Sequence, residues 1–206
     1  EMSASLVGSE MCIRDRWTTD IGGFFGANIN DPEFHELLVR WFEYGCFCPV
    51  MRLHGYRWPL QPQYGTTGGA TCVSGAPNEV WSYTDQVCEI LSDYLRLRER
   101  MLPYITELME EAHEKGTPVM RPLFYDFPED KESWNVETEY MFGPKVLVKP
   151  ITDADARETD VYLPGGASWT NAWTGETFEG GQKVHVAAPI EQIPLFTRDG
   201  YKLPMK

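Results

Sequence analysis

The sequence lacks both a long hydrophobic run and a surplus of positive charge. None of its apolar stretches approaches the roughly 20 residues that span a bilayer, so we expect no membrane partner. Its lysines and arginines number 18 against 31 aspartates and glutamates, which gives a formal net charge of −13. Because a chain this acidic repels phosphate backbones, we also expect no nucleic-acid partner.

Several common catalytic and metal-binding patterns are missing as well. The chain contains no G-x-S-x-G, H-E-x-x-H, Walker or G-x-G-x-x-G sequence. Its five cysteines are odd in number and irregular in spacing, which argues against a disulfide framework. Cys46 and Cys48 would face one side of a strand, where we expect packing residues rather than metal ligands.

The first sixteen residues show neither periodicity nor turn signals. They are not a signal peptide, because a basic start and a long enough apolar core are both missing. The string LVGSEMCIRD matches one reading frame of a transposon-derived sequencing adapter. We therefore expect residues 1–16 to be adapter read-through, with native sequence beginning near Trp17 and the gene continuing upstream. A native N-terminal extension is the alternative.

The next segment reads as strand, helix and strand. A β-prone run at residues 17–20 stops at Gly22-Gly23, and a second one covers residues 46–55. Between them, Asp31-Pro32-Glu33 has the composition of a helix start. Gly45 closes this helix, whose apolar stripe consists of Phe34, Leu37, Leu38, Trp41 and Phe42. This order predicts a βαβ unit with a parallel sheet.

The remainder of the chain divides near residue 118. Residues 56–78 are rich in Gly, Thr, Pro and Gln and predict a long loop. A helical pattern follows over residues 79–115, which Pro103 should kink or divide and Gly116 should end. Short β-prone runs after Pro118 predict a small antiparallel sandwich. The expected fold class is α/β followed by all-β, with domains at 17–118 and 119–206.

Four residues at the ends of the first two strands are candidates for ligand binding. Asp20 can accept hydrogen bonds from sugar hydroxyls or orient an arginine that donates them, but it can equally be a turn cap. Arg52 and His54 share one strand face and can reach a sugar, unless they are an ion-paired arginine and a surface histidine. Phe24 can wall an apolar sugar face or belong to the core.

Aromatic residues are abundant, at 13% of the chain with seven tryptophans. This composition fits carbohydrate binding, in which sugar faces stack on rings, but it also fits an aromatic-rich core. Trp58, Trp81 and Trp134 invite the stacking interpretation without a spacing that supports it.

The motifs together resemble glycoside hydrolase family 31. The resemblance rests on W-T-T-D-I-G-G-F at 17–24, R-L-H-G at 52–55, L-P-Y at 102–104, P-V-M-R-P at 118–122 and I-P-L-F at 193–196. These blocks follow the family's order and cover nearly everything after residue 16. The resemblance implies the last two βα units of a (β/α)8 TIM barrel and then a proximal C-terminal antiparallel β-sandwich.

The resemblance also implies roles for the four candidates. Asp20 and His54 would line the subsite of the terminal sugar, Phe24 would form its hydrophobic wall, and Arg52 is the arginine of the R-x-H block. The nucleophile and the acid/base aspartates precede the D-I-G-G-F block in this family, so neither lies in this chain. The parent enzyme would cleave by double displacement, which requires no cofactor and no metal.

The substrate expected from the resemblance is an oligosaccharide with a terminal α-xylosyl or α-glucosyl residue. W-T-T before the D-I-G-G-F block and the G-A-P-N-E-V-W run ending at Trp81 look more like α-xylosidases than α-glucosidases. The chain alone is then an inactive fragment. The alternative is a non-catalytic carbohydrate-binding module that uses the sandwich and its tryptophans. The sequence indicates neither a compartment nor an oligomeric state.

Overall fold

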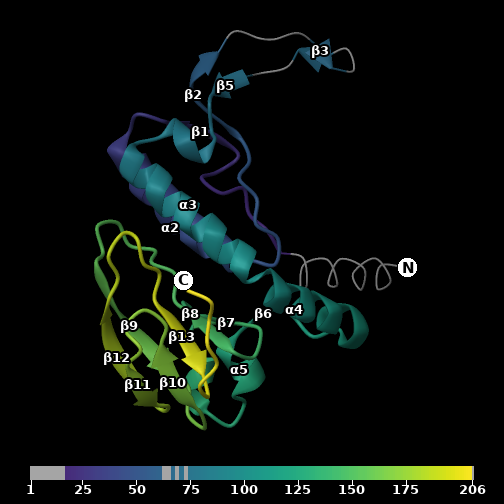
Figure 1. Ribbon diagram of the computed structural model, residues 1–206, viewed down its shortest axis with the longest axis vertical. Helices are drawn as coiled ribbons and strands as arrows, with labels where there is room; N and C mark the ends of the chain where they lie inside the picture. Colours follow the sequence, from purple (N-terminus) through teal and green to yellow (C-terminus); the bar gives the residue numbers. More distant parts are fainter. Residues whose placement is uncertain (1–16, 62–65, 68–69, 72–73, 206) are drawn as a thin grey trace.

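The computed structural model describes residues 17–61, 66–67, 70–71 and 74–205, arranged as a helical part packed on a β-sandwich (Figure 1). The expectation of adapter sequence at residues 1–16 falls outside these residues. Helices α2 and α3 lie side by side and contact each other closely. None of the helices in the described segments is both long and apolar enough to cross a membrane.

Helix α2 covers Pro32–Cys46 and begins as its sequence predicts. The side chain of Asp31 accepts a hydrogen bond from the Glu33 amide at 3.0 Å, which satisfies one of the free donors of the first turn. Phe34, Leu38 and Phe42 of the expected stripe are buried. Leu37 lies at the edge of the stripe, and it is 51% exposed, contrary to the prediction.

The two strands expected before and after α2 make only a short parallel contact. Ile21 and Leu53 form an isolated parallel bridge, and the Ile21 amide donates to the Arg52 carbonyl at 3.2 Å. Regular pairing starts later, where β1 (Phe25–Asn28) lies parallel to β2 (Tyr56–Gln61). The predicted βαβ order and parallel direction are therefore confirmed, whereas the predicted strand limits are wrong.

Local backbone geometry explains these wrong limits. The amides of Phe47 and Cys48 donate back to the last carbonyls of α2, so the chain is still turning where a strand was expected. On the other segment, Gly22 and Gly23 have φ values of 79° and 86°, which lie outside the β region. Neither segment can keep the extended backbone that a regular ladder needs.

The expected loop after residue 55 contains strands. β2 pairs antiparallel with β5 (Ser74–Ala76), and β3 (Thr66–Thr67) pairs with β4 (Ala70–Thr71). The three-stranded sheet has the order β1-β2-β5. In Figure 1, β2 and β5 project from the end of the helical part that lies away from the sandwich.

The long helical pattern is divided, as Pro103 predicts. Helix α3 covers Asp85–Arg100 and α4 covers Leu102–Lys115, with Met101 as the cap between them. Gly116 ends α4 in a left-handed conformation with a φ of 68°. The predicted start at residue 79 is too early, because a short 3-10 turn, η1 (Val80–Ser82), precedes the Thr84 cap of α3.

The rest of the chain forms two antiparallel sheets, as predicted. The larger sheet has the order β11-β10-β13-β8-β7-β6, and the smaller one pairs β12 with β9. Their bounds are β6 Met120–Arg121, β7 Tyr140–Phe142, β8 Val146–Val148, β9 Glu158–Leu163, β10 Ser168–Asn171, β11 Thr177–Glu179, β12 Gln182–Ala187 and β13 Leu195–Arg198. Helix α5 (Leu123–Asp126) and the 3-10 turn η2 (Lys131–Trp134) lie between β6 and β7.

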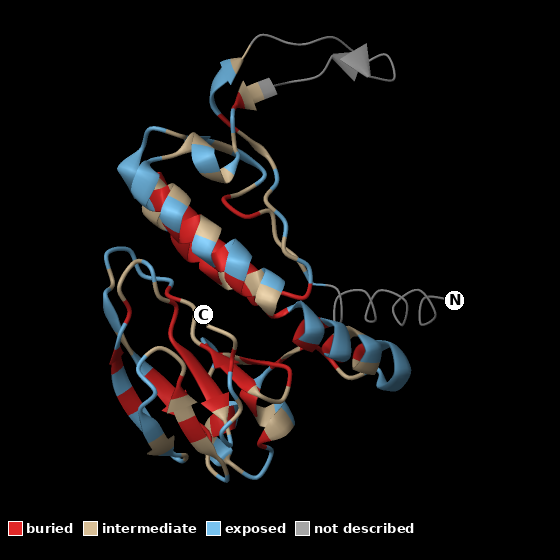
Figure 2. Ribbon diagram, in the orientation of Figure 1, coloured by how far each residue is buried: buried red, intermediate tan, exposed pale blue. Residues whose placement is uncertain are grey.

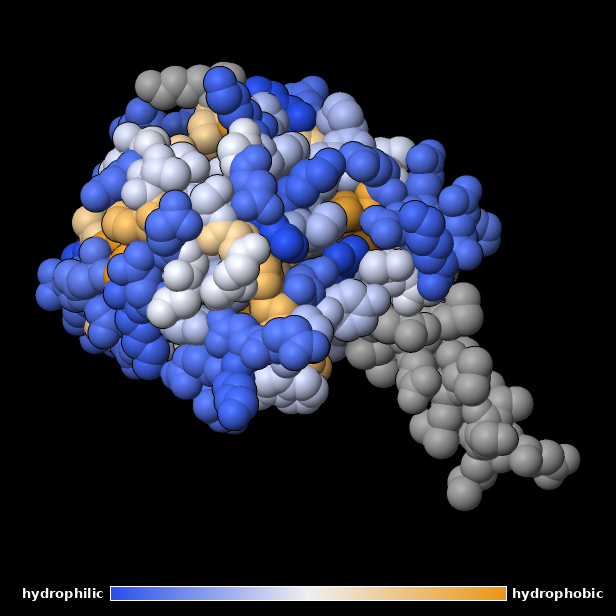
Figure 3. Space-filling view, turned by 90° about the horizontal axis from the view of Figure 1, so that it is seen from below, coloured by the Kyte–Doolittle hydropathy of each residue, from blue (hydrophilic) through white to orange (hydrophobic). Residues whose placement is uncertain are grey.

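The centre of the larger sheet is buried on both faces (Figure 2). Val146 and Val148 of β8 pack with the helices in one apolar cluster. Leu147 between them belongs to a second cluster, which lies between the two sheets and includes Trp169. This alternation follows the two-residue period of a strand. Seen from the direction of Figure 3, the surface is largely hydrophilic, with small hydrophobic areas.

Candidate functional site

Asp20 and Arg52 form an ion pair between the two segments that precede β1 and β2. Oδ1 of Asp20 accepts a hydrogen bond from Nη2 of Arg52. The arginine side chain is 49% exposed and the aspartate side chain 22%, so both groups remain accessible from solvent. The same ion pair matches one expectation for each residue: Asp20 orients an arginine, and Arg52 is paired with an acidic neighbour.

Phe24 and His54 form a second pair beside the first. Their ring centroids lie 5.5 Å apart, with an interplanar angle of 43°. Phe24 is 56% exposed, so the expectation that it belongs to the core is wrong. The structure thus brings together, in two cross-segment pairs, the four residues that the sequence singles out.

The Ile21–Leu53 bridge lies between these two pairs in the sequence. Ile21 is fully buried and packs into the main apolar cluster, whereas Arg52 and His54 on either side of Leu53 are exposed. The backbone therefore directs Ile21 into the core and presents polar groups toward solvent. A carboxylate, a guanidinium and an imidazole next to a phenyl ring offer acceptors, donors and an apolar surface for a polyhydroxylated ligand.

Gly55, beside His54, lets the two segments approach closely. A Cβ atom at this position would lie 2.3 Å from the Phe24 carbonyl oxygen, and the φ of 100° also favours glycine. The Gly55 carbonyl accepts from the Asn78 side chain at 3.2 Å, and the Asn78 amide oxygen in turn accepts from the Tyr83 hydroxyl at 2.6 Å. Burial raises the pKa of Tyr83, which keeps this hydroxyl protonated as a donor.

Sequence reasoning missed the residue that lies beneath the site. Arg57 on β2 is fully buried, and its guanidinium donates to the carbonyls of Ile21 and Gly23 on the first segment and of His54 on the second. The only available signal was an arginine at the start of a predicted loop, five positions after Arg52. That signal is weak because backbone carbonyls leave no side-chain pattern in a sequence.

Further exposed rings extend along β1 and β2. Phe25 is 69% exposed, and its ring stacks on Tyr56 with a centroid distance of 6.3 Å. Trp58 is 49% exposed on the same strand as Tyr56. Trp81 and Trp134, which are also exposed, lie on η1 and η2 and contribute to neither residue pair.

Cys46 and Cys48 are buried free thiols, as expected for packing residues. Burial raises the pKa of Cys46 to about 12 and that of Cys48 to about 11, so both are neutral. The described residues contain no cluster of three or more histidine, cysteine and acidic side chains that could hold a metal ion.

A cluster of buried polar groups joins the helices to the sandwich. Arg40 donates to Glu43 at 3.1 Å and to the carbonyl oxygen of Ala188 at 2.7 Å. The Tyr94 hydroxyl donates to Glu43 at 3.0 Å. Burial raises the pKa of Glu43 to about 8, against the opposing influence of Arg40. This cluster lies in the joint between the two parts and includes none of the four candidates.

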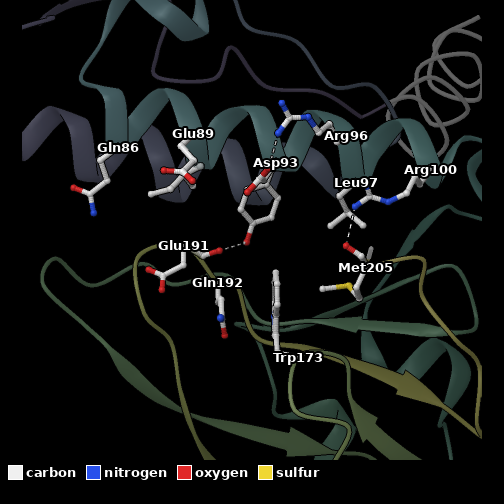
Figure 4. A pocket seen from close by; sticks show the side chains of 12 residues that line it. Gln86, Glu89, Asp93, Arg96, Leu97, Arg100, Trp173, Glu191, Gln192 and Met205 are labelled. Carbon is white, nitrogen blue, oxygen red and sulfur yellow. Dashed lines mark hydrogen bonds and ion pairs between the residues drawn. The ribbon is translucent and has the colours of Figure 1, made fainter.

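A cavity of about 610 Å³ lies along the same joint (Figure 4). Glu89, Asp93 and Arg96 line it from α3, and Trp173 rises toward them from the sandwich. Asp93 and Arg96 pair with each other, and both side chains are more than 60% exposed. None of the four candidates lines this cavity, so it is distinct from the site at Asp20.

Comparison with known proteins divides the chain into the same two kinds of structure. Residues 2–108 match the glycosyl hydrolases family 31 TIM-barrel domain, and residues 116–203 match the glycosyl hydrolase family 31 C-terminal domain. The expected fold class, the end of a TIM barrel followed by antiparallel strands, is confirmed.

Individual relatives give the same result. The α-xylosidase of Saccharolobus solfataricus is 38% identical over 189 residues, which are 92% of this chain and 23% of the relative. Alpha-glucosidase 2 of Bacillus thermoamyloliquefaciens is 36% identical over 97% of this chain and 22% of the relative. The crystal structure of a GH31 α-xylosidase from a soil metagenome, complexed with xylose, has a TM-score of 0.87 and 49% identity, covering 92% of this chain and 28% of that one. The chain thus spans about a quarter of the length of these relatives.

Proposed function

Because this chain belongs to glycosyl hydrolase family 31, we propose that it supplies the sugar-binding part of a retaining α-glycosidase. Asp20, Phe24, Arg52 and His54 bind the terminal sugar of an oligosaccharide. The single observation that carries this proposal is the meeting of these four residues in two adjacent pairs, at the ends of two parallel segments. In TIM-barrel enzymes the substrate binds at the carboxyl ends of the barrel strands, and we assign that place to the two segments that meet at the Ile21–Leu53 bridge, ahead of β1 and β2.

Each residue has a distinct part in binding. The Asp20 carboxylate accepts hydrogen bonds from sugar hydroxyls, and Arg52 fixes its orientation through Oδ1. His54 donates to or accepts from a neighbouring hydroxyl, depending on its tautomer. The exposed face of Phe24 packs against the C–H groups of the sugar ring.

Bond cleavage requires groups beyond these four. A retaining glycosidase uses two carboxyl groups about 5–5.5 Å apart, one as nucleophile and one as acid/base. Asp20 is the one carboxylate among the four proposed residues, and it is neutralised by Arg52. We infer that the catalytic pair belongs to the remaining part of the barrel and that this chain alone is inactive. We also propose a preference for α-xylosyl over α-glucosyl residues, in line with the 49% identity to an α-xylosidase.

A titration of the chain with D-xylose, followed residue by residue by NMR, tests the proposal. We expect changes at the four residues, and a loss of affinity in Asp20→Asn of about 10- to 100-fold, which matches ~1.5–3 kcal/mol for a hydrogen bond to a charged group. Asp93→Asn is the matched control, because it breaks the exposed pair with Arg96 at a distance from the site. The proposal would be rejected if xylose changed the NMR signals of none of the four residues, or if Asp20→Asn and Asp93→Asn lost equal affinity for xylose.

Two further measurements address the mechanism and the sugar. Hydrolysis of an aryl α-xyloside by the chain should stay at the level of the buffer, and turnover would contradict the absence of the catalytic pair. Replacing D-xylose by D-glucose should weaken binding, since a site shaped for xylose must exclude the extra hydroxymethyl group. Equal or tighter binding of glucose would reverse the assignment of substrate.

The alternative of a separate binding module on the sandwich has less support. Trp169 is fully buried between the sheets, and one face of Trp134 is covered by Phe124 at a centroid distance of 4.6 Å. If the sandwich nevertheless binds sugar, Trp134→Ala should weaken binding of an oligosaccharide to the chain, whereas Asp20→Asn should not.

A further inference from the structure

We infer that Arg57 is the positioning residue of the sugar site. This inference rests on the proposed function, since it concerns the residues that bind the sugar. Arg57 is placed to hold the backbone of both segments in the register that pairs Asp20 with Arg52 and Phe24 with His54.

The contacts of the guanidinium carry this inference. Nη1 donates to the carbonyl oxygen of Gly23 at 2.8 Å, and Nη2 donates to that of Ile21 at 3.1 Å. These two carbonyls enclose the turn between Asp20 and Phe24. Nη2 also donates to the carbonyl oxygen of His54, at 3.5 Å. One rigid group therefore contacts the backbone next to three of the four binding residues.

The surroundings of Arg57 fix the plane of its guanidinium. The ring of Phe34 on α2 lies 5.3 Å below its central carbon, which favours a planar cation over the aromatic face. Gly22 also lies against the guanidinium, where a Cβ would come within 2.7 Å of Nη2. The position is closed, and Arg57 has no exposed surface.

The charge of Arg57 also indicates a dedicated role. A buried cation is costly unless dipoles or an anion compensate it, and the carbonyls of Ile21, Gly23, His54 and Tyr56 are hydrogen-bond partners of Arg57 within the described residues. Lysine cannot replace this function, because an ammonium group lacks the planar fork that reaches carbonyls on both segments.

Arg98 provides a matched comparison inside the same chain. It is partly buried, and it donates to the carbonyls of Cys46, Cys48 and Pro49 at 2.6–2.7 Å. Those carbonyls precede the R-x-H block and touch none of the four binding residues directly. Arg98 therefore also holds backbone carbonyls through its guanidinium, but it does so away from the residues that are proposed to bind the sugar.

The experiment compares Arg57→Lys with Arg98→Lys in the full chain. The measurements are urea unfolding, D-xylose affinity by NMR, and the NMR signals of the Gly23 amide and the His54 ring without sugar. We expect both variants to lower stability, and only Arg57→Lys to shift these signals and to weaken xylose binding, by about tenfold as for one lost hydrogen bond. Unchanged affinity in Arg57→Lys, or an equal loss in Arg98→Lys, would overturn the inference.

A second pair of variants keeps the test open if Arg57→Lys does not fold. Gly22→Ala places a methyl group against Nη2, whereas Gly26→Ala has a similar φ of 88° but open space around the added atom. We expect only Gly22→Ala to weaken xylose binding, and equal losses would overturn the inference. If the unmodified chain shows no xylose response at the four residues, the proposed function fails; if it responds but the Arg57 and Gly22 variants do not differ from their controls, the inference alone fails.

Discussion

The proposed sugar-binding end and the sandwich of this molecule are built on different principles. At the sandwich, regular ladders run through a sheet that is buried on both faces. At the proposed sugar-binding end, two irregular segments share one isolated bridge, and a buried arginine and close glycine contacts hold them together. The difference indicates that apolar packing stabilises the sandwich, whereas a few specific polar and steric contacts position the backbone of the candidate site.

The largest effect should come from the core of the sandwich. Trp169→Ala removes a fully buried ring whose indole N–H donates to the Pro164 carbonyl oxygen at 2.9 Å. We expect the free energy of unfolding to fall by about 3–5 kcal/mol, as is usual for a large aromatic residue truncated in a core. Denaturant unfolding measures it, with the exposed Trp134→Ala as control. A loss below that of the control would contradict the packing account.

Gly55→Ala should have the next largest effect, this time at the proposed sugar-binding end. The added Cβ would meet the Phe24 carbonyl oxygen at 2.3 Å, so the two segments must move apart. Gly26→Ala controls for backbone strain, because its φ of 88° is similar but nothing lies near the added atom.

We expect Gly55→Ala to cost about 1–3 kcal/mol more than Gly26→Ala, the usual cost of overpacking, and to abolish the xylose response. Urea unfolding and the NMR titration measure both quantities. Equal values for the two variants would mean that the close approach of the segments does not matter.

Local signals in the sequence predicted the helices of this fold. Asp31 and Pro32 start α2, Pro103 divides the long helical segment and Gly116 ends it, since caps and breakers act on the nearest few residues. Asp20, Arg52 and His54 were also found from sequence, because polar residues close to glycines mark the ends of barrel strands, and Phe24 was singled out by its place four residues after Asp20. Their assignment to sugar binding remains a proposal.

The limits of the strands at the site were not predictable in this way. A β-prone composition does not reveal whether the pairing partner keeps an extended backbone, and here Gly22, Gly23 and the turn after α2 prevent it. The role of Arg57 could not be predicted from the sequence, because it donates to backbone carbonyl oxygens, which every residue has. The exposure of Leu37 depends on which neighbours cover α2, and its own sequence does not encode them.

The joint between the two regions should respond to pH. The raised pKa of Glu43, about 8 against an ordinary value of 4.5, means that the folded state keeps a proton that the unfolded state has lost within this interval. Stability from this group is therefore present at low pH and decreases as pH rises toward the folded pKa. Glu43→Gln should flatten the decrease by at most ~1.4 kcal/mol per pH unit, the slope for one proton.

Urea unfolding at several pH values between about 5 and 8 measures this slope. Glu36→Gln is the control: the pKa of Glu36 is lowered by its hydrogen bond with Arg157, so it titrates below this range. Its stabilising contribution is present at higher pH and lost in acid, and the slope above about pH 5 should not change. If the free energy of unfolding changes with pH equally steeply in the native chain and in Glu43→Gln, the protonation of Glu43 does not contribute to the stability of the contact between the helices and the sandwich.

The smallest effect on stability should come from the Asp20–Arg52 ion pair, which is central to the proposed function. Asp20 and Arg52 are partly exposed, and exposed ion pairs contribute only ~0.2–1 kcal/mol to folding. A double-mutant cycle with Asp20→Asn and Arg52→Met should give a coupling energy in that range, while the same variants greatly weaken xylose binding. If stability and xylose binding instead fall in proportion, the Asp20–Arg52 pair stabilises the fold as a whole. The proposed contrast between a stabilising core and a specific binding site would then be wrong.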